Sequence, residues 1–249
     1  MQPPVNVKNI TIVLCRPKYS GNVGSIARCA KNMGVNSIIV VAGKNLVEEE
    51  MLQMSTHCAA DVISQIHYFE SLDKALAKFQ YVVGTTSRLG SARGPVVSPR
   101  DMAEQLVNLS QNNEIALLFG SEDKGLSNAE LRYCNAIVTI PTSEDFKSIN
   151  LSHAVMIVCY EIFTARQGPD KAFTPKMATS MEIEGMYVHL KAVLTQIGFL
   201  NPENPEYWMM HIRRFLSRTK LFSREVKIIR GICRQIDWAM KRSSSRGES

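Results

Sequence analysis

Five short apolar runs, rich in β-branched residues, recur along the first 141 residues of the chain. The runs are ITIVL (10–14), SIIVVA (37–42), YVVGTT (81–86), IALLFG (115–120) and AIVTIP (136–141). Such runs are typical of strands buried inside a parallel sheet, where both faces are covered. Helical patterns occupy 24–34, 71–79, 98–110 and 151–167. Strands that alternate with helices predict an α/β fold, with a parallel sheet and helices on both faces.

The composition changes after the last of these helices. Residues 168–180, GPDKAFTPKMATS, are rich in glycine, proline and small polar residues, which is typical of a domain boundary. Beyond them the apolar periodicity predicts three more helices, at 181–197, 205–217 and 223–242. We therefore expect an α/β domain over 1–167, a linker over 168–180 and a small all-α extension over 181–249.

Composition narrows the class of protein. Of 249 residues, 45% are hydrophobic and 21% are charged, which excludes collagen-like and wholly disordered chains. No apolar run approaches the ~20 residues of a membrane-spanning helix, and the start of the chain has no basic segment before its first apolar stretch. The six cysteines are far apart, without metal-finger spacing, as buried thiols in a reducing compartment would be. We expect a soluble, cytoplasmic protein with no membrane segment.

The charge is unevenly distributed. The net charge is +6, and residues 1–169 hold 15 basic and 15 acidic side chains, whereas residues 170–249 hold 14 and 8. A basic extension on a neutral body indicates binding to nucleic acid or to an anionic membrane surface. The alternative is a solvated helical face with uneven charge. The aromatic and proline content of the extension favours a folded module over a single membrane-surface helix.

The loops that follow the strands are the first candidates for a site, because open α/β sheets bind ligands beyond the carboxyl ends of their strands. After the first strand comes YSGNVGSIAR (19–28). Its two glycines, at the turn from strand to helix, let backbone amides approach an anion, and Arg28 offers a guanidinium to a phosphate. The spacing is not GxGxxG, which argues against a simple dinucleotide fold. An ordinary glycine turn with a surface arginine is the alternative.

Two further loops have unusual composition. The segment FGSEDKGL (119–126) has two glycines around charged residues, so its backbone could form the rim of a cofactor site. The alternative is a polar loop that leads into the capping box at 127–130. After the fifth strand, Ser148, Asn150 and Ser152 precede an apolar helix, where capping explains each residue singly. Capping leaves unexplained why small and amide residues recur after three strands of one sheet.

Other kinds of chemistry find less support in the sequence. There is no Gly-x-Ser-x-Gly motif, and Ser148 has no histidine at a diagnostic spacing. His57, His67, His189 and His211 lack the spacing of metal ligands. We therefore expect a reaction without a metal ion.

The three loops together resemble a known family. Asn22-x-Gly24-x-x-x-Arg28, then Phe119-Gly120-x-Glu122-x-x-Gly125-Leu126, then Ile140-Pro141 with Ser148-Ile149-Asn150-x-Ser152, are similar in order and separation to the three motifs of SpoU-type RNA ribose 2'-O-methyltransferases of the SPOUT superfamily. The resemblance covers about residues 8–167. The run at 198–232 also resembles the helical extension of the TrmJ-type subfamily, which methylates ribose 32 of the tRNA anticodon loop.

This resemblance implies several properties. The family has a trefoil knot near the carboxyl end of its sheet, binds S-adenosylmethionine in that knot and forms homodimers with the active site between subunits. It implies catalytic roles for Asn22, Arg28 and Ser148, with Arg28 reaching the RNA from the partner subunit. The implied cofactor residues are Thr85, Thr86, Ser87, Gly120, Glu122, Ile140, Ser148, Ile149 and Asn150.

The chemistry of S-adenosylmethionine explains why no serine–histidine–acid catalytic triad is needed. A sulfonium is already an activated methyl donor, so transfer to a ribose 2'-oxygen needs positioning and proton removal more than a nucleophilic side chain. A guanidinium is a demanding general base, so our hypothesis is that Arg28 holds a phosphate and polarises the 2'-hydroxyl while Ser148 orients it. The chain departs from the subfamily at Ile149, usually leucine, and at Ser121 and Asp123, where arginine is usual.

The leading hypothesis is an S-adenosylmethionine-dependent tRNA ribose methyltransferase whose basic extension holds phosphates. A ribosomal RNA 2'-O-methyltransferase and a non-catalytic RNA-binding factor on the same scaffold are the alternatives. Trp208, Trp238 and Tyr207 are placed to stack on bases or to fill the core of the extension. The expected RNA-binding residues are Arg213, Arg214, Arg218, Lys220 and Arg224.

Overall fold

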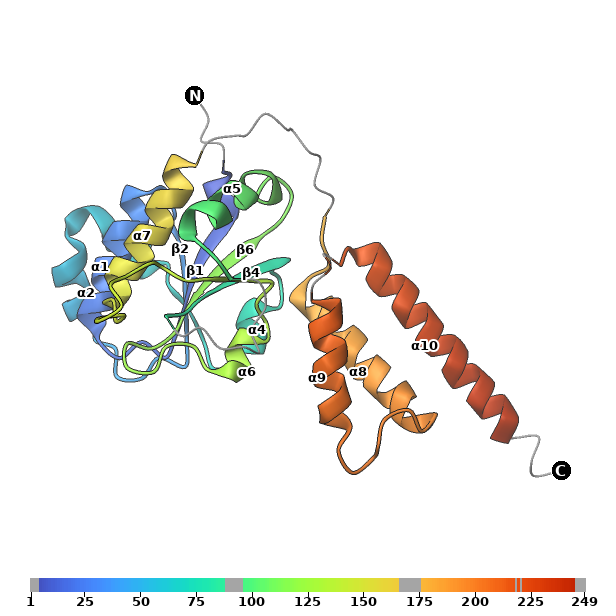
Figure 1. Cartoon of the computed structure of the whole chain (residues 1–249). Helices are drawn as coiled ribbons and strands as arrows, with labels where there is room; N and C mark the ends of the chain where they lie inside the picture. The colour runs from blue at the N-terminus through green and yellow to red at the C-terminus, as the bar shows by residue number, and fades with distance from the viewer. Residues whose placement is uncertain (1–4, 88–95, 166–175, 218, 220, 245–249) are drawn as a thin grey trace. The chain divides into compact units, whose positions relative to one another are not determined.

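The chain folds into two compact units, Met1–Pro175 and Lys176–Ser249. The structure is a computed structural model, and it describes residues 5–87, 96–165, 176–217, 219 and 221–244 (Figure 1).

A parallel sheet forms the centre of the first unit. Within the described residues, seven strands pair in the order β3-β2-β1-β6-β4-β7-β5, and every pairing is parallel. The strands are β1 (Ile10–Cys15), β2 (Ser37–Val41), β3 (His67–Phe69), β4 (Tyr81–Thr85), β5 (Val96–Val97), β6 (Ile115–Phe119) and β7 (Ala136–Val138). All residues of β1 and β6 are buried, which explains why their sequences are apolar without alternation.

Helices cover the sheet (Figure 1). They are α1 (Ser20–Asn32), α2 (Glu48–Ser55), α3 (Ala60–Ser64), α4 (Leu72–Leu76), α5 (Pro99–Leu109), α6 (Asn128–Leu131) and α7 (Leu151–Thr164), with 3-10 turns η1 (Val7–Asn9) and η2 (His57–Ala59). Helix α7 packs against α1 and α5, and α2 packs against α1. Helices α4 and α6 lie over the other face, so the expected α/β architecture is confirmed.

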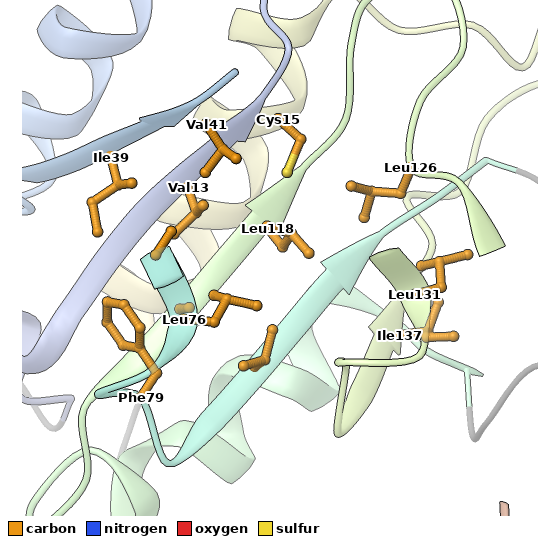
Figure 2. Packing of buried hydrophobic residues seen from close by; sticks show 13 residues of the cluster. Val13, Cys15, Ile39, Val41, Leu76, Phe79, Leu118, Leu126, Leu131 and Ile137 are labelled. Carbon is orange, nitrogen blue, oxygen red and sulfur yellow. The ribbon is translucent and has the colours of Figure 1, made fainter. Parts of the chain in front are cut away.

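Alternate strand residues build the core beneath α4 and α6. Figure 2 shows Val13 and Cys15 of β1 on this side, with Leu118 of β6. Leu76 and Phe79, at and just beyond the end of α4, close over them and are fully buried. Cys15 therefore serves as a small apolar side chain of the core, and burial raises the pKa of its thiol far above the usual range.

Two features of the first unit differ from the sequence-based expectation. Helix α1 begins at Ser20, four residues before the expected start at 24, because Tyr19 is extended and Gly21 and Gly24 lie inside the helix rather than in a turn. A Cβ at Gly24 would lie 2.1 Å from the backbone oxygen of Met51 on α2. Gly24 therefore permits close packing of two helices, and not the approach of an anion.

The second unit is a small helical module. Helix α8 (Ser180–Gln196) packs against both α9 (Pro205–Leu216) and α10 (Ser223–Ser244). A capping box between Thr179 and Glu182 starts α8. The buried core of the module comprises Ala178, Met186, Tyr187, Leu200, Met209, Leu221 and Val226. None of the helices in the described ranges is both long and apolar enough to cross a membrane.

Candidate functional site

The carboxyl ends of three neighbouring strands meet at one edge of the sheet, where the sequence predicts the cofactor. Strand order places β4 between β6 and β7. The Thr85 hydroxyl donates to the Leu118 carbonyl over 3.1 Å, and the Thr86 amide donates to the Val138 carbonyl over 3.0 Å. Thr139 returns a hydroxyl hydrogen bond to the Thr86 carbonyl. The loops that begin after these strands are therefore held side by side.

The loop after β6 folds back tightly on itself. Ser121 and Gly125 form a bridge, in which the Gly125 amide donates to the Ser121 carbonyl over 2.8 Å. Gly125 has a φ of +63°, and a Cβ at Gly120 would lie 2.0 Å from the Gly125 carbonyl carbon. Only glycine fits at position 120, since backbone occupies the place of its side chain.

Two basic residues that follow β1 anchor this loop. Arg16 forms a double hydrogen bond with the buried carboxylate of Glu130, which is also the capping-box acid of α6. The Lys18 ammonium lies 2.6 Å from Asp123, and this contact holds the Asp123 pKa at about 2. The Lys18 backbone amide donates to Glu122 over 3.0 Å. The sequence pattern did not indicate either anchor, although Arg16 and Lys18 lie within three residues of the start of the first motif.

A chain of hydrogen bonds joins the three motifs. The Asn22 amide group donates to Glu122 over 2.9 Å, and its oxygen accepts from the Asn150 amide group over 3.2 Å. The Asn150 side-chain oxygen in turn accepts from the backbone amide and the hydroxyl of Ser152, and Asn150 thereby caps the start of α7. Asn150 is thus both a helix cap and a link between loops that are 128 residues apart in sequence.

These side chains surround a pocket of about 380 Å³. Five predicted site residues line it, namely Asn22, Glu122, Ser148, Ile149 and Asn150, together with Tyr19, Gly21, Ser25, Met54 and Leu151. The predicted residues Thr85, Thr86, Ser87, Gly120 and Ile140 are not part of this lining. Met54 lies on α2, a helix that the sequence pattern did not predict, so no signal pointed to it.

Arg28 lies outside the pocket. Its side chain is exposed on α1, three residues beyond Ser25 and on the same side of the helix. At 1.5 Å per residue, its Cα is about 9 Å along the helix from that of Asn22. Within the described residues, no three His, Cys, Asp or Glu side chains are grouped to hold a metal ion.

The predicted RNA-binding residues have different surroundings. Arg213 donates to both Glu184 oxygens, over 2.6 and 2.8 Å, and its guanidinium lies 4.2 Å from the centre of the Tyr187 ring. Arg214 and Arg224 are exposed, and Arg218 and Lys220 fall outside the described residues. Arg213 therefore joins α9 to α8, a structural task that the sequence did not indicate.

Replacement of Arg213 by alanine is expected to lower the free energy of unfolding of the helical module by about 2 kcal/mol, because Glu184 is left half-buried without its partner. Arg224→Ala, at an exposed position, is expected to change it by less than about 0.5 kcal/mol. Both tryptophans of the chain, Trp208 and Trp238, lie in this module, so denaturant unfolding followed by tryptophan fluorescence reports on it directly. Equal stability of the two variants would contradict the structural role of Arg213.

Comparisons with known proteins agree with this arrangement. A family model described as the SpoU rRNA Methylase family matches residues 9–160, and one described as the tRNA methyltransferase TrmJ C-terminal domain matches residues 181–247. A tRNA (cytidine/uridine-2'-O-)-methyltransferase TrmJ of Photorhabdus laumondii is 34% identical, over 94% of this chain and 100% of its own. A Pseudomonas aeruginosa relative, named as a tRNA (cytidine/uridine/adenosine-2'-O-)-methyltransferase TrmJ, is also 34% identical, over 90% of this chain and 91% of its own.

Solved structures give the same result. The crystal structure of TrmJ from Z. mobilis ZM4 superposes with a TM-score of 0.79 at 27% identity, over 91% of this chain and 98% of that chain. The crystal structure of a putative methylase family protein from Neisseria gonorrhoeae superposes with a TM-score of 0.67 at 33% identity, over 74% of this chain and 94% of that chain.

Proposed function

Since the chain belongs to the SpoU methylase family and carries the C-terminal domain of its TrmJ members, we propose that it transfers a methyl group from S-adenosylmethionine to a ribose 2'-oxygen of tRNA. The relatives that match nearly all of the chain are named as tRNA 2'-O-methyltransferases, which supports tRNA as the substrate. We further propose nucleotide 32 of the anticodon loop as the target, a cytidine or uridine.

The observation that carries this proposal is the hydrogen-bonded link from Glu122 through Asn22 to Asn150. Each residue comes from a different motif, and each motif taken alone has an ordinary structural explanation. Joined in this way, the three loops enclose one pocket at the carboxyl edge of the sheet. Open α/β sheets bind their ligands at this edge.

The residues at this edge fit S-adenosylmethionine. A carboxylate has about four lone-pair positions, and Glu122 uses two of them for Asn22 and Lys18, which leaves acceptors for ligand hydroxyls. Apart from Glu122, the residues of 85–87, 120–122 and 138–140 do not line the pocket. Their backbone, which follows the neighbouring strands β4, β6 and β7, would hold the adenine and ribose portions. The bound cofactor supplies a methyl group on an electron-deficient sulfonium.

The side chains of the chain then have to place the ribose and assist proton removal. Ser148, which lines the pocket, would orient the 2'-hydroxyl. Arg28 would hold the adjacent phosphate and polarise that hydroxyl. Because Arg28 lies outside the pocket of its own chain, we propose that it serves the pocket of a second copy in a homodimer. We also propose that the chain forms the trefoil knot of this family near the carboxyl end of its sheet.

The affinity for tRNA is expected to fall steeply with salt. If the basic helices neutralise about five phosphates, the slope of log K against log salt is about −3.5 to −4.5. Fluorescence anisotropy of labelled tRNA at several potassium chloride concentrations measures this slope. A flat dependence would show that the basic extension is not the main binding surface.

The proposed activity is tested by incubation of the protein with methyl-labelled S-adenosylmethionine and either unmodified tRNA or ribosomal RNA. We expect label in tRNA alone. Label in ribosomal RNA alone would favour the ribosomal RNA methyltransferase. No transfer to either RNA, together with no binding of the cofactor, would favour a non-catalytic RNA-binding factor.

A further inference from the structure

Helix α9 presents large aromatic side chains to solvent. Tyr207 is 54% exposed, Trp208 is 49% exposed and Phe215 is 67% exposed. Phe199, in the segment before α9, is 59% exposed. Together with His211 these residues form what we call the aromatic face.

The core of the module does not require these rings. Met209 is buried, and Ile212 and Leu216 pack against the same core, so the opposite side of α9 already supplies its hydrophobic contacts. On an amphipathic helix the remaining side is ordinarily polar. Exposed aromatic side chains gathered on one helix are instead typical of a binding surface. Of the two alternatives that the sequence left open for Tyr207 and Trp208, a place in the core of the module is therefore wrong.

The rings support one another. The Tyr207 ring lies edge-on to the Trp208 ring at 5.9 Å between centroids, and edge-on to the His211 ring at 5.0 Å. Phe199 and Trp208 are 6.4 Å apart. Mutual edge-to-face contacts of this kind hold aromatic side chains in place without burying their outer faces. The aromatic face is thus ordered and still offers flat apolar surface.

The charge of the whole module favours an anionic partner. Residues 176–249 contain 13 basic and 7 acidic side chains. Most of the described acids are bonded within the module: Glu184 to Arg213, Glu206 to Lys191, Asp237 to His189, and Glu182 and Glu225 to backbone amides. Arg214 is exposed on the same helix as the rings. Aromatic rings interleaved with arginine are the surface that unpaired nucleotides recognise.

We propose that the aromatic face of α9 stacks unpaired bases of the RNA loop that carries the methylation target. This proposal rests on the proposed function, because it takes a tRNA as the substrate. It assigns base stacking to Tyr207 and Trp208, on the helix that also carries Arg214.

The test compares two RNAs on the full chain. One is an unmodified anticodon stem-loop, and the other has the same stem with abasic sites in place of the loop bases. We expect Trp208→Leu to raise the Kd of the intact stem-loop about tenfold, since one base–aromatic stack contributes roughly that much. The Kd of the abasic RNA should change by less than about twofold, because no base is present to stack. Trp208→Phe should recover most of the lost affinity.

Val188→Ala is the control, because Val188 is an apolar side chain without a ring that is 67% exposed on α8 of the same module. It should leave the Kd of the intact stem-loop unchanged. An equal loss with both RNAs, no loss with either RNA, or an equal loss in Val188→Ala would each overturn the assignment. So would a change in oligomeric mass with unchanged RNA affinity, which would identify the face as a protein interface.

Failure of this inference is distinguishable from failure of the proposed function. If wild-type protein methylates tRNA and Trp208→Leu binds both RNAs as wild type does, only the stacking role is wrong. If wild-type protein neither binds nor methylates tRNA, the proposed function is wrong, and the stacking role is overturned with it.

Discussion

Replacement of Arg28 by lysine is expected to lower kcat/KM for tRNA methylation by about 100-fold, a loss typical of one preorganised charged donor. A lysine keeps the charge but has no planar fork, so it cannot hold a phosphate through two parallel hydrogen bonds while polarising the hydroxyl. Arg28 is exposed and lies outside the pocket, so the Kd of S-adenosylmethionine and the melting temperature should stay unchanged. Steady-state kinetics with tRNA, with calorimetric titration of the cofactor, measures these quantities.

Arg132→Lys is the matched control, since Arg132 is an exposed arginine of the same unit that lies against the Tyr133 ring. It should leave turnover within about twofold, as surface substitutions usually do. Near-normal turnover of the Arg28→Lys variant would contradict the proposed role of the guanidinium.

Replacement of Gly120 by alanine is expected to weaken S-adenosylmethionine binding by at least about 100-fold, because the overpacked loop must shift. The added Cβ would meet the Gly125 carbonyl carbon at 2.0 Å and the Leu126 nitrogen at 2.2 Å, and backbone cannot move aside as a flexible side chain does. The loop that carries Glu122 would therefore leave its place. Calorimetric titration of the cofactor measures the change, with circular dichroism as a check on folding.

Gly125→Asn is the matched control for Gly120→Ala. Gly125 has a φ of +63°, a conformation that asparagine tolerates, and a Cβ there would meet no atom within 4 Å. Cofactor affinity of this variant should stay within about threefold of wild type. An unchanged Kd in the Gly120→Ala variant would show that the loop after β6 does not hold the cofactor.

A second variant at position 28, Arg28→Ala, combined with Gly120→Ala, tests whether the site is shared between subunits. If Arg28 serves the partner's pocket, a dimer of one Arg28→Ala chain and one Gly120→Ala chain contains one complete site and one doubly defective site. Equal mixing should then restore about a quarter of the wild-type activity, since half of the randomly formed dimers are mixed. No recovery, with mixed dimers demonstrated by mass, would place Arg28 at the pocket of its own chain.

The fold was predictable where burial is complete. The five predicted strands are present because their residues face the core on both sides, which produces apolar runs without alternation. The strands β3 and β5 were missed because the first is largely exposed and the second has two residues. Helix α2 was missed because it opens on three glutamates and buries only Met51 and Ser55, too few positions for a clear period.

The site was predictable only as far as residues near each motif could indicate it. Asn22, Glu122 and Asn150 stand in recognisable sequence motifs, and the structure brings them together. Arg16 and Lys18 anchor the loop after β6 through partners 105 to 114 residues away, and a sequence pattern carries no signal for such pairs. For the same reason Arg213, a surface arginine by its local sequence, proved to be paired with Glu184.

The most direct measurement is the position of the methyl group on the RNA. Unmodified tRNA is incubated with the full chain and S-adenosylmethionine, digested, and mapped for 2'-O-methylated nucleotides by mass spectrometry. We expect one methylated ribose, at nucleotide 32, which disappears when the cofactor is left out. A methyl group at any other nucleotide, or on a base, would contradict the proposed function.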